Sequence, residues 1–290
     1  MAVAVLLAGA VLWGLYWWPL KALAQAGVSG PLVPMAAYGV SALTLAPLVW
    51  VQRRQWRPRL GVLALIALLG GWANASFTTT LTHGSVVRVM LLFYLSPVWT
   101  VLAARVVLGE PVTPLRLAAL ATAMAGLVTT LGGTAVLEAP LAAMDLLALS
   151  SGLAFALTNV AMRAAQGVSD AVRATALFSG CAGLCGVFAV VTGDPAPLPE
   201  GPAAAGLAAL GLLWVLPATL ATYYGVARLE AGRAGILLLS EMVVGLVSAV
   251  LLGNETLGPR EAVGGALVLA AAALEARGQG QTVRTGEQPA

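Results

Sequence analysis

One carboxylate, Glu241, lies inside the apolar stretch LLLSEMVVGL, within an apolar run over residues 234–252. Its place about eight residues into this run corresponds to roughly 10–12 Å along a helix axis, near the middle of a bilayer. An ionised acidic residue there costs about 2.5–3.5 kcal/mol, and such residues usually face the protein interior and mark a substrate or proton path. We therefore predict that Glu241 contacts substrate and exchanges a proton. The alternative is a protonated Glu241 that braces two helices through a hydrogen bond.

Polar and aromatic side chains in other apolar runs form a second group of candidates. The stretch WANASFTTTLTHG collects amide and hydroxyl groups at the end of one run, where Asn74 and Thr78 share a helix face with Phe77. The alternative for such residues is hydrogen bonding between membrane helices, and for tryptophans it is packing or anchoring at the membrane interface. We predict a substrate cavity lined by Trp13, Trp17, Asn74, Phe77, Thr78, Tyr94, Trp99, Phe155, Asn159, Trp214, Tyr223 and Glu241.

The residues that most often bind metals are few. The single histidine, His83, is a second candidate for proton coupling because only histidine normally titrates near neutral pH, although its place at the end of an apolar run also fits an interfacial residue. Cys181 and Cys185 are one helical turn apart, a spacing that suits neither a disulfide within a helix nor a metal site without further ligands. We predict no metal and no cofactor.

The elements that position these residues must cross a membrane. The chain of 290 residues is 60% hydrophobic and 9% charged, whereas a soluble domain carries roughly 25% charged residues. Its apolar runs are about as long as a bilayer core requires, and only helices satisfy their own backbone hydrogen bonds there. We predict an all-α integral membrane protein with ten transmembrane helices, over residues 1–20, 32–51, 60–81, 89–108, 115–131, 141–162, 174–192, 203–224, 234–252 and 262–274.

The distribution of basic residues predicts the orientation of these helices. With the first residue in the cytoplasm, all of the fifteen Lys and Arg residues except Lys21, Arg88 and Arg260 fall on the cytoplasmic side. This bias is the one that the positive-inside rule expects. We therefore predict a multi-pass protein of the cell (inner) membrane with both termini in the cytoplasm. The polar residues 278–290 are predicted to be a disordered cytoplasmic tail.

An internal repeat relates the two halves of the chain. Residues 87–114 align without a gap with residues 232–259, and the aligned pairs include Arg88 with Arg233, Glu110 with Glu255, and Pro114 with Pro259. We predict a duplication into residues 1–133 and 134–277, with five transmembrane helices each. Because five is odd, the second copy is inverted in the membrane. Inverted repeats place a substrate site near the midplane and permit alternating access.

The chain resembles the EamA-type branch of the drug/metabolite transporter superfamily over nearly its whole length. The resemblance is carried by LWGLYWWPLK at residues 12–21, by LSPVWTVLAARVVLGEPVTP at residues 95–114, and by the degenerate copy LSEMVVGLVSAVLLGNETLGP at residues 239–259. In the second copy this family often has Glu-Pro where the chain has Glu241 and Met242. The proline is kept only as Pro97, so the sequence leaves a helix break at the second position open.

The resemblance implies a transporter and not an enzyme. We expect a secondary active transporter that exports small metabolites such as amino acids by alternating access, with proton coupling as an option. The alternatives are an exporter of amphipathic cationic drugs, for which Glu241 is the counter-charge, and a passive channel. The expected partners are a small-molecule substrate and the lipid bilayer, without nucleic acid, and the expected state is a monomer. A phosphate substrate is disfavoured because no Arg or Lys lies deep within a run.

Overall fold

The computed structural model describes residues 1–28, 30–83, 86–132, 140, 142–165, 167–191, 200–253 and 258–277. These residues form helices and turns, with no strand among them. The predicted tail at residues 278–290, the aligned residue Glu255 and the side chain of His83 lie outside the described part of the chain.

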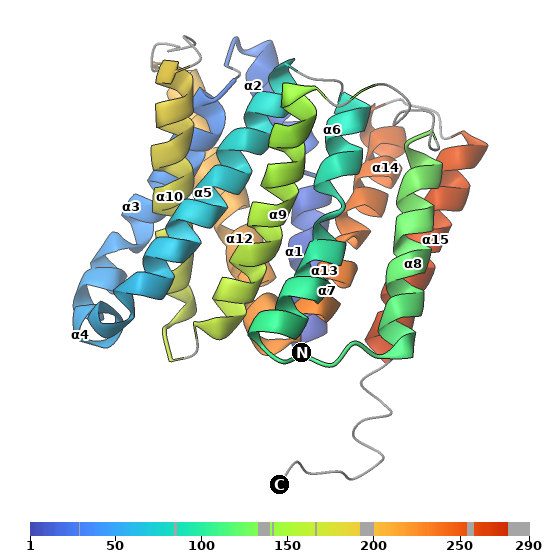
Figure 1. The fold of residues 1–290 in the computed structure, drawn as a ribbon. Coiled ribbons are helices and arrows are strands. Elements are labelled where there is room, and N and C mark those ends of the chain that lie inside the picture. The colour runs from blue at the N-terminus through green and yellow to red at the C-terminus, as the bar shows by residue number, and fades with distance from the viewer. Residues whose placement is uncertain are drawn as a thin grey trace, which may run out of the picture.

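Helical segments run alternately in opposite directions through the bundle (Figure 1). The first part of the chain forms α1 (Ala2–Gly14), α2 (Trp17–Gln25), α3 (Leu32–Val51), α4 (Arg53–Trp56), η1 (Arg57–Arg59), α5 (Leu60–His83), α6 (Val86–Phe93), α7 (Ser96–Val107) and α8 (Pro114–Thr130). The second part forms α9 (Ala143–Ala164), α10 (Asp170–Val191), α11 (Pro202–Ala209), η3 (Leu210–Val215), α12 (Leu216–Arg228), α13 (Ala231–Leu238), α14 (Ser240–Gly253) and α15 (Pro259–Arg277).

Within the described residues, eight helical segments are long and apolar enough to cross a membrane. The helix over Pro114–Thr130 is apolar but shorter, and α15 carries charged residues such as Arg260 and Glu275 near its ends. The prediction of an all-helical, multi-pass membrane protein is therefore confirmed. Ten transmembrane helices in two inverted repeats remain a prediction.

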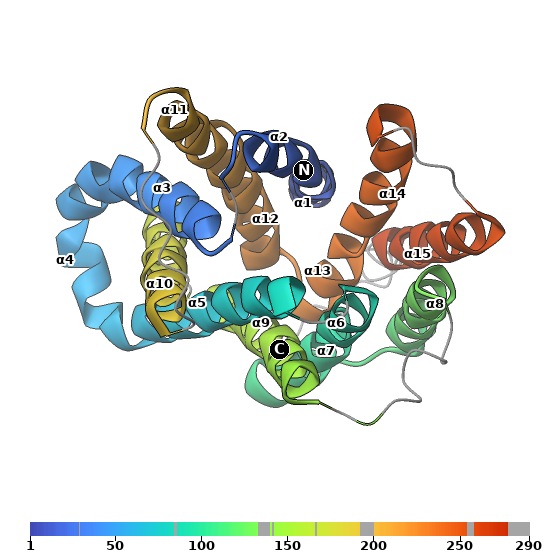
Figure 2. The ribbon, with the colours of Figure 1, turned by 90° about the horizontal axis from the view of Figure 1, so that it is seen from above.

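The packing order differs from the order along the chain. Seen from above (Figure 2), α8 and α15 pack together at one edge of the bundle, and α3 and α4 lie at the opposite edge. Helix α1 packs against α12 and α14, whereas α10 packs against α3 and α5. Helices of the two predicted halves therefore pack against each other.

Several helices are interrupted, and two of the interruptions occupy aligned positions. Helix α6 gives way to α7 at Tyr94, and α13 gives way to α14 at Leu239, the residue aligned with Tyr94. Pro97 explains the first break because proline lacks an N–H and clashes with the preceding turn. The second break is present although Met242 replaces the proline. There the Ser240 hydroxyl donates to the carbonyl of Leu237 at 2.8 Å, a bond that competes with the helix and bends it.

Candidate functional site

The two aligned breaks bring Tyr94 and Glu241 together. Tyr94 directly follows α6, and Glu241 lies in the first turn of α14. The Tyr94 hydroxyl donates a hydrogen bond to Oε1 of Glu241 over 3.3 Å. The predicted candidates Tyr94 and Glu241, 147 residues apart, are therefore neighbours at the point where two interrupted helices meet. In transporters built from inverted repeats, interrupted helices of this kind form the substrate and ion sites.

A small cavity adjoins this pair. It has room for about one water molecule, so a metabolite requires the helices to move apart before it can enter. Glu241 is the one carboxylate in the described lining, and no basic side chain contributes to it. The lining residues come from the α6–α7 break, from α9 and from the α13–α14 break: Phe93, Tyr94, Ser96, Pro97, Thr100, Phe155, Gly235, Leu238, Leu239 and Glu241.

Phe93 is the centre of an aromatic cluster beside the cavity. Its ring centroid lies 4.3 Å from that of Phe77 and 5.5 Å from those of Tyr94 and Phe155. Phe77, Tyr94 and Phe155 were predicted from the sequence to line a cavity, whereas Phe93 was not. The signal that could have identified it is its place immediately before the break, because a side chain there projects toward the same junction as Tyr94.

Three predicted tryptophans instead join α1 and α2 to the second half of the chain. The indole N–H of Trp13 donates to Thr222 at 3.2 Å, and that of Trp17 donates to Ser248 at 2.9 Å. The indole of Trp214, in η3, donates to the carbonyl of Leu12 at 2.7 Å. These side chains do not line the small cavity. They hold α1 and α2 against α12 and α14.

Helix α1 also approaches the backbone of the Glu241 turn very closely at Gly14. A Cβ atom added at Gly14 would lie 2.5 Å from the carbonyl oxygen of Glu241 and 2.6 Å from Cβ of Val244. Glycine is therefore required for this contact, because any side chain would push the two helices apart. The contact places α1 directly beside the carboxylate-bearing turn.

Several other predicted residues lie away from the cavity. The Asn74 amide donates to the hydroxyl of Tyr38 at 2.8 Å and accepts from the thiol of Cys185 at 3.4 Å, so it joins α3, α5 and α10. Asn74 therefore forms hydrogen bonds between helices, which was the alternative to the predicted role in lining the cavity. Thr78 on α5 and Tyr223 on α12 are likewise absent from the cavity lining.

Some buried polar groups outside the cavity lining have no hydrogen-bond partner among the described residues. Asn159 on α9 is fully buried, and within the described part of the chain neither its side-chain nitrogen nor its oxygen has a partner. The same holds, among these residues, for the buried hydroxyl of Thr219 on α12 and the buried indole nitrogen of Trp99 on α7. Native proteins leave few such groups unsatisfied, and each one needs a physical reason.

Charged side chains connect helices at one end of the bundle, which we call the N-terminal face because the N-terminus, the α7–α8 connection with Glu110 and the start of α13 lie there (Figure 1). The Glu110 carboxylate accepts hydrogen bonds from the backbone N–H groups of Ala231 at 2.9 Å and Gly232 at 3.4 Å. It thereby caps α13, where the helix dipole favours a negative charge. Arg163 on α9 lies 4.0 Å from the same carboxylate.

Ion pairs reinforce both ends. At the N-terminal face, Arg116 on α8 pairs with Glu230, just before α13, and with Glu275 on α15 at 3.3 Å. At the opposite end, Arg88 on α6 pairs with Asp145 on α9 at 2.9 Å. These charges lie away from the Tyr94–Glu241 pair and connect helices from both halves of the chain.

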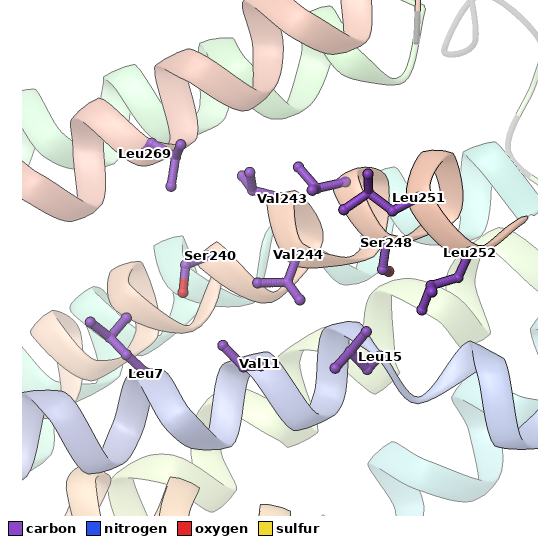
Figure 3. Close-up of a pocket in the computed structure, with 11 residues that line it drawn as sticks. Leu7, Val11, Leu15, Ser240, Val243, Val244, Ser248, Leu251, Leu252 and Leu269 are labelled. Carbon is purple, nitrogen blue, oxygen red and sulfur yellow. The ribbon is translucent and has the colours of Figure 1, made fainter. Parts of the chain in front are cut away.

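A larger groove of about 480 Å³ runs between α1, α14 and α15 (Figure 3). Leu7 and Val11 on α1 and Leu15 just after it line one side of the groove, and Leu269 faces it from α15. Apart from Ser240 and Ser248, the described lining is hydrocarbon. The groove is open to the side, and Leu251 on its wall is 74% exposed. It therefore belongs to the apolar outer surface of the bundle and offers little to a polar solute.

The fold and this site define a class: a multi-pass helical membrane protein whose interrupted helices meet at a half-buried carboxylate. The chain belongs to the EamA-like transporter family, whose family model matches residues 1–132 and 142–276. It is thus a membrane transporter of the drug/metabolite transporter superfamily, as its sequence resemblance indicated, and proteins of this family are generally not enzymes.

The comparison with solved structures supports the same fold. A crystal structure of a protein that is 19% identical matches with a TM-score of 0.77, over 94% of this chain and 96% of that chain. At this identity the likeness concerns the fold alone. A search of curated proteins gave no match.

Proposed function

We propose that the protein is a secondary active transporter that exports small amine-bearing metabolites, such as amino acids, across the cell (inner) membrane by alternating access. The proposal includes ten transmembrane helices in two inverted repeats, residues 1–133 and 134–277, with both termini in the cytoplasm. The observation that supports it most directly is the Tyr94–Glu241 hydrogen bond at the meeting point of two aligned helix breaks.

Glu241 can couple the solute to a proton because its charge is costly at this depth. Ionised and alone, the carboxylate costs about 2.5–3.5 kcal/mol, and the hydrogen bond from Tyr94 offsets about 1.5–3 kcal/mol of this. The carboxylate is therefore stable either when protonated or when paired with a cation. A solute amine and a proton then compete for one site, which is the requirement for exchange of one against the other.

The small size of the cavity supports the proposal of alternating access. The cavity beside Glu241 has room for about one water molecule, and Glu110 and Arg116 connect helices at the N-terminal face. Loading a solute requires the α6–α7 and α13–α14 segments to separate from α9. Movement of one predicted repeat against the other would open the cavity to each side in turn.

The decisive experiment replaces Glu241 with glutamine and measures transport in proteoliposomes. Glutamine keeps the size and hydrogen bonding of a protonated glutamate but cannot ionise. We expect Glu241→Gln to fold, to allow exchange of solute down its own gradient with weaker binding, and to lose accumulation driven by a pH gradient. Glu200→Gln, an exposed carboxylate outside the helices, is the matched control. Full pH-driven accumulation by Glu241→Gln would show that the carboxylate does not couple transport to protons and only joins two helices through its hydrogen bond.

A second candidate function is export of amphipathic cations. It is favoured by the aromatic cluster around Phe93 and by the single carboxylate in a described lining that holds no basic side chain. Uptake of a panel of amino acids and cationic dyes, each with and without a pH gradient, distinguishes the two candidates. Stimulation of uptake by solute on the far side of the membrane distinguishes both from a passive channel.

A further inference from the structure

Asn159 is a buried amide whose hydrogen-bonding capacity is unused. Its side chain is 0% exposed, and both its nitrogen and its oxygen lack a partner in the part of the chain that the structure describes. Asn74, the comparable amide of α5, is satisfied by Tyr38 and Cys185. A protein gains nothing in stability from an unsatisfied buried amide, so Asn159 has the character of a group kept for a ligand.

The position of Asn159 on α9 places it next to the proposed substrate site. Phe155, Asn159 and Arg163 lie at successive intervals of four residues and therefore share one helix face. Phe155 lines the cavity beside Glu241, and Arg163 lies beside Glu110 at the N-terminal face. Asn159 is thus roughly 6 Å along α9 from the cavity, on the side of the closed end. When that end opens, the cavity extends past Asn159.

The side chains around the cavity favour an uncharged hydrogen-bonding group of the solute as the partner of Asn159. A carboxamide offers two donors and one acceptor, which match an amide, a hydroxyl or an ester of the solute. A carboxylate at the same depth would need a positive charge beside it, and the described cavity lining provides none. The next basic residue on this face, Arg163, is engaged by Glu110 and by the carbonyl of Ala227, to which it donates at 2.6 Å.

We infer that Asn159 is a second substrate contact and that the preferred solute is a small cationic amine bearing a neutral hydrogen-bonding group, such as an amino-acid amide. The amine pairs with Glu241, the neutral group bonds to Asn159, and an apolar part lies against Phe93 and Phe155. This inference rests on the proposed function, because Glu241 must bind the amine.

Counterflow of labelled phenylalaninamide into proteoliposomes tests this inference, with phenylalanine and phenethylamine as competitors. Phenethylamine lacks the second polar group, and phenylalanine carries a carboxylate in its place. We expect the wild-type protein to prefer phenylalaninamide over either competitor by about tenfold, the ratio that one well-made hydrogen bond provides. The variant Asn159→Leu, whose side chain has the same number and branching of non-hydrogen atoms, should bring the preference over phenethylamine to within about twofold.

A matched control separates binding from folding. Asn159→Leu removes an unsatisfied amide, so its melting temperature should equal or exceed that of the wild type. Asn74→Leu removes a satisfied amide, so it should melt earlier while it keeps the preference for phenylalaninamide. An unchanged preference in Asn159→Leu, or an early melting of that variant, would overturn the second contact.

The remaining outcomes address the solute class and the proposed function separately. Stronger competition by phenylalanine than by phenylalaninamide would overturn the neutral-group assignment and leave a transporter of zwitterions. The absence of counterflow of labelled phenylalaninamide would overturn the inferred solute class itself. If Glu241→Gln takes up phenylalaninamide against its gradient as the wild type does, the proposed function fails irrespective of what Asn159 does.

Discussion

Arg116 is the residue on which the charge balance of the N-terminal face depends. Its guanidinium is 5% exposed and contacts Glu230, Glu275 and the carbonyl of Pro111. We expect Arg116→Leu to lower the free energy of unfolding by about 3 kcal/mol, because Glu275 stays buried after its closest partner is removed. The positive charge of Arg233 acts on Glu275 as well and keeps the loss near the lower end of the usual range.

Thermal unfolding in detergent measures this effect. Arg105→Leu is the control, since Arg105 is exposed near the end of α7 and its replacement should leave the melting temperature nearly unchanged. Equal melting temperatures for the two variants would show that the buried ion pairs contribute nothing to stability.

At the residue scale, the sequence could predict which side chains are unusual but not which neighbours they meet. Glu241 was identifiable because a charge in an apolar run is costly, and its hydrogen bond to Tyr94 is consistent with that reasoning. Asn74 was equally unusual in its run, yet it contacts Tyr38 and Cys185 instead of the cavity. Helical spacing defines a face, whereas the helix that packs against this face depends on the tertiary arrangement.

At the scale of elements, Glu110 has a clear structural task. It follows α7 in the first half of the chain and caps α13 in the second half. Its hydrogen bonds therefore hold the end of α7 to the start of α13 at the N-terminal face. We expect Glu110→Ala to weaken this closed arrangement by about 1–2 kcal/mol, the usual value of a helix cap with its charge. The population of molecules open at this face should rise by roughly 5- to 30-fold.

The accessibility of a cysteine placed at Thr100 reports this opening. Thr100 is fully buried and lines the cavity, so Thr100→Cys should react slowly with a thiol reagent until the N-terminal face opens. Adding Glu110→Ala should accelerate labelling from that side, whereas Glu261→Ala, at the start of α15, should not. Identical labelling rates in the two backgrounds would mean that Glu110 is a cap without a role in closure.

Helix breaks show how far an element can be predicted from local sequence. Pro97 predicts the break before α7 because its ring is incompatible with an uninterrupted helix. The break before α14 has no such marker, since Ser240 can sit within a helix or bend it, depending on where its hydroxyl bonds. The alignment of the two segments was the stronger guide, because it paired Tyr94 with Leu239, where the second break occurs.

For the whole molecule, the central prediction concerns orientation. Gln25 ends α2 and Gln55 lies in α4, at opposite ends of the bundle (Figure 1), and both are exposed. With cytoplasmic termini, Gln25→Cys should react with a membrane-impermeant thiol reagent in intact cells, and Gln55→Cys should be protected. Both should react after permeabilisation, while the native Cys181 and Cys185 stay silent because they are buried. Labelling of Gln55→Cys and protection of Gln25→Cys in intact cells would show that the orientation is opposite to the predicted one.

The packing of α1 against the second half of the chain has a consequence for biosynthesis. Trp13 and its partner Thr222 are separated by 209 residues, and Trp17 and Ser248 by 231. Helices α1 and α2 therefore leave the ribosome long before α12 and α14 exist, and until then Trp13 and Trp17 lack these partners. Assembly cannot be completed helix by helix as synthesis proceeds. In a chain truncated before α12, α1 has no α12 or α14 to pack against. The cell's quality-control machinery would then recognise α1 as an unassembled helix.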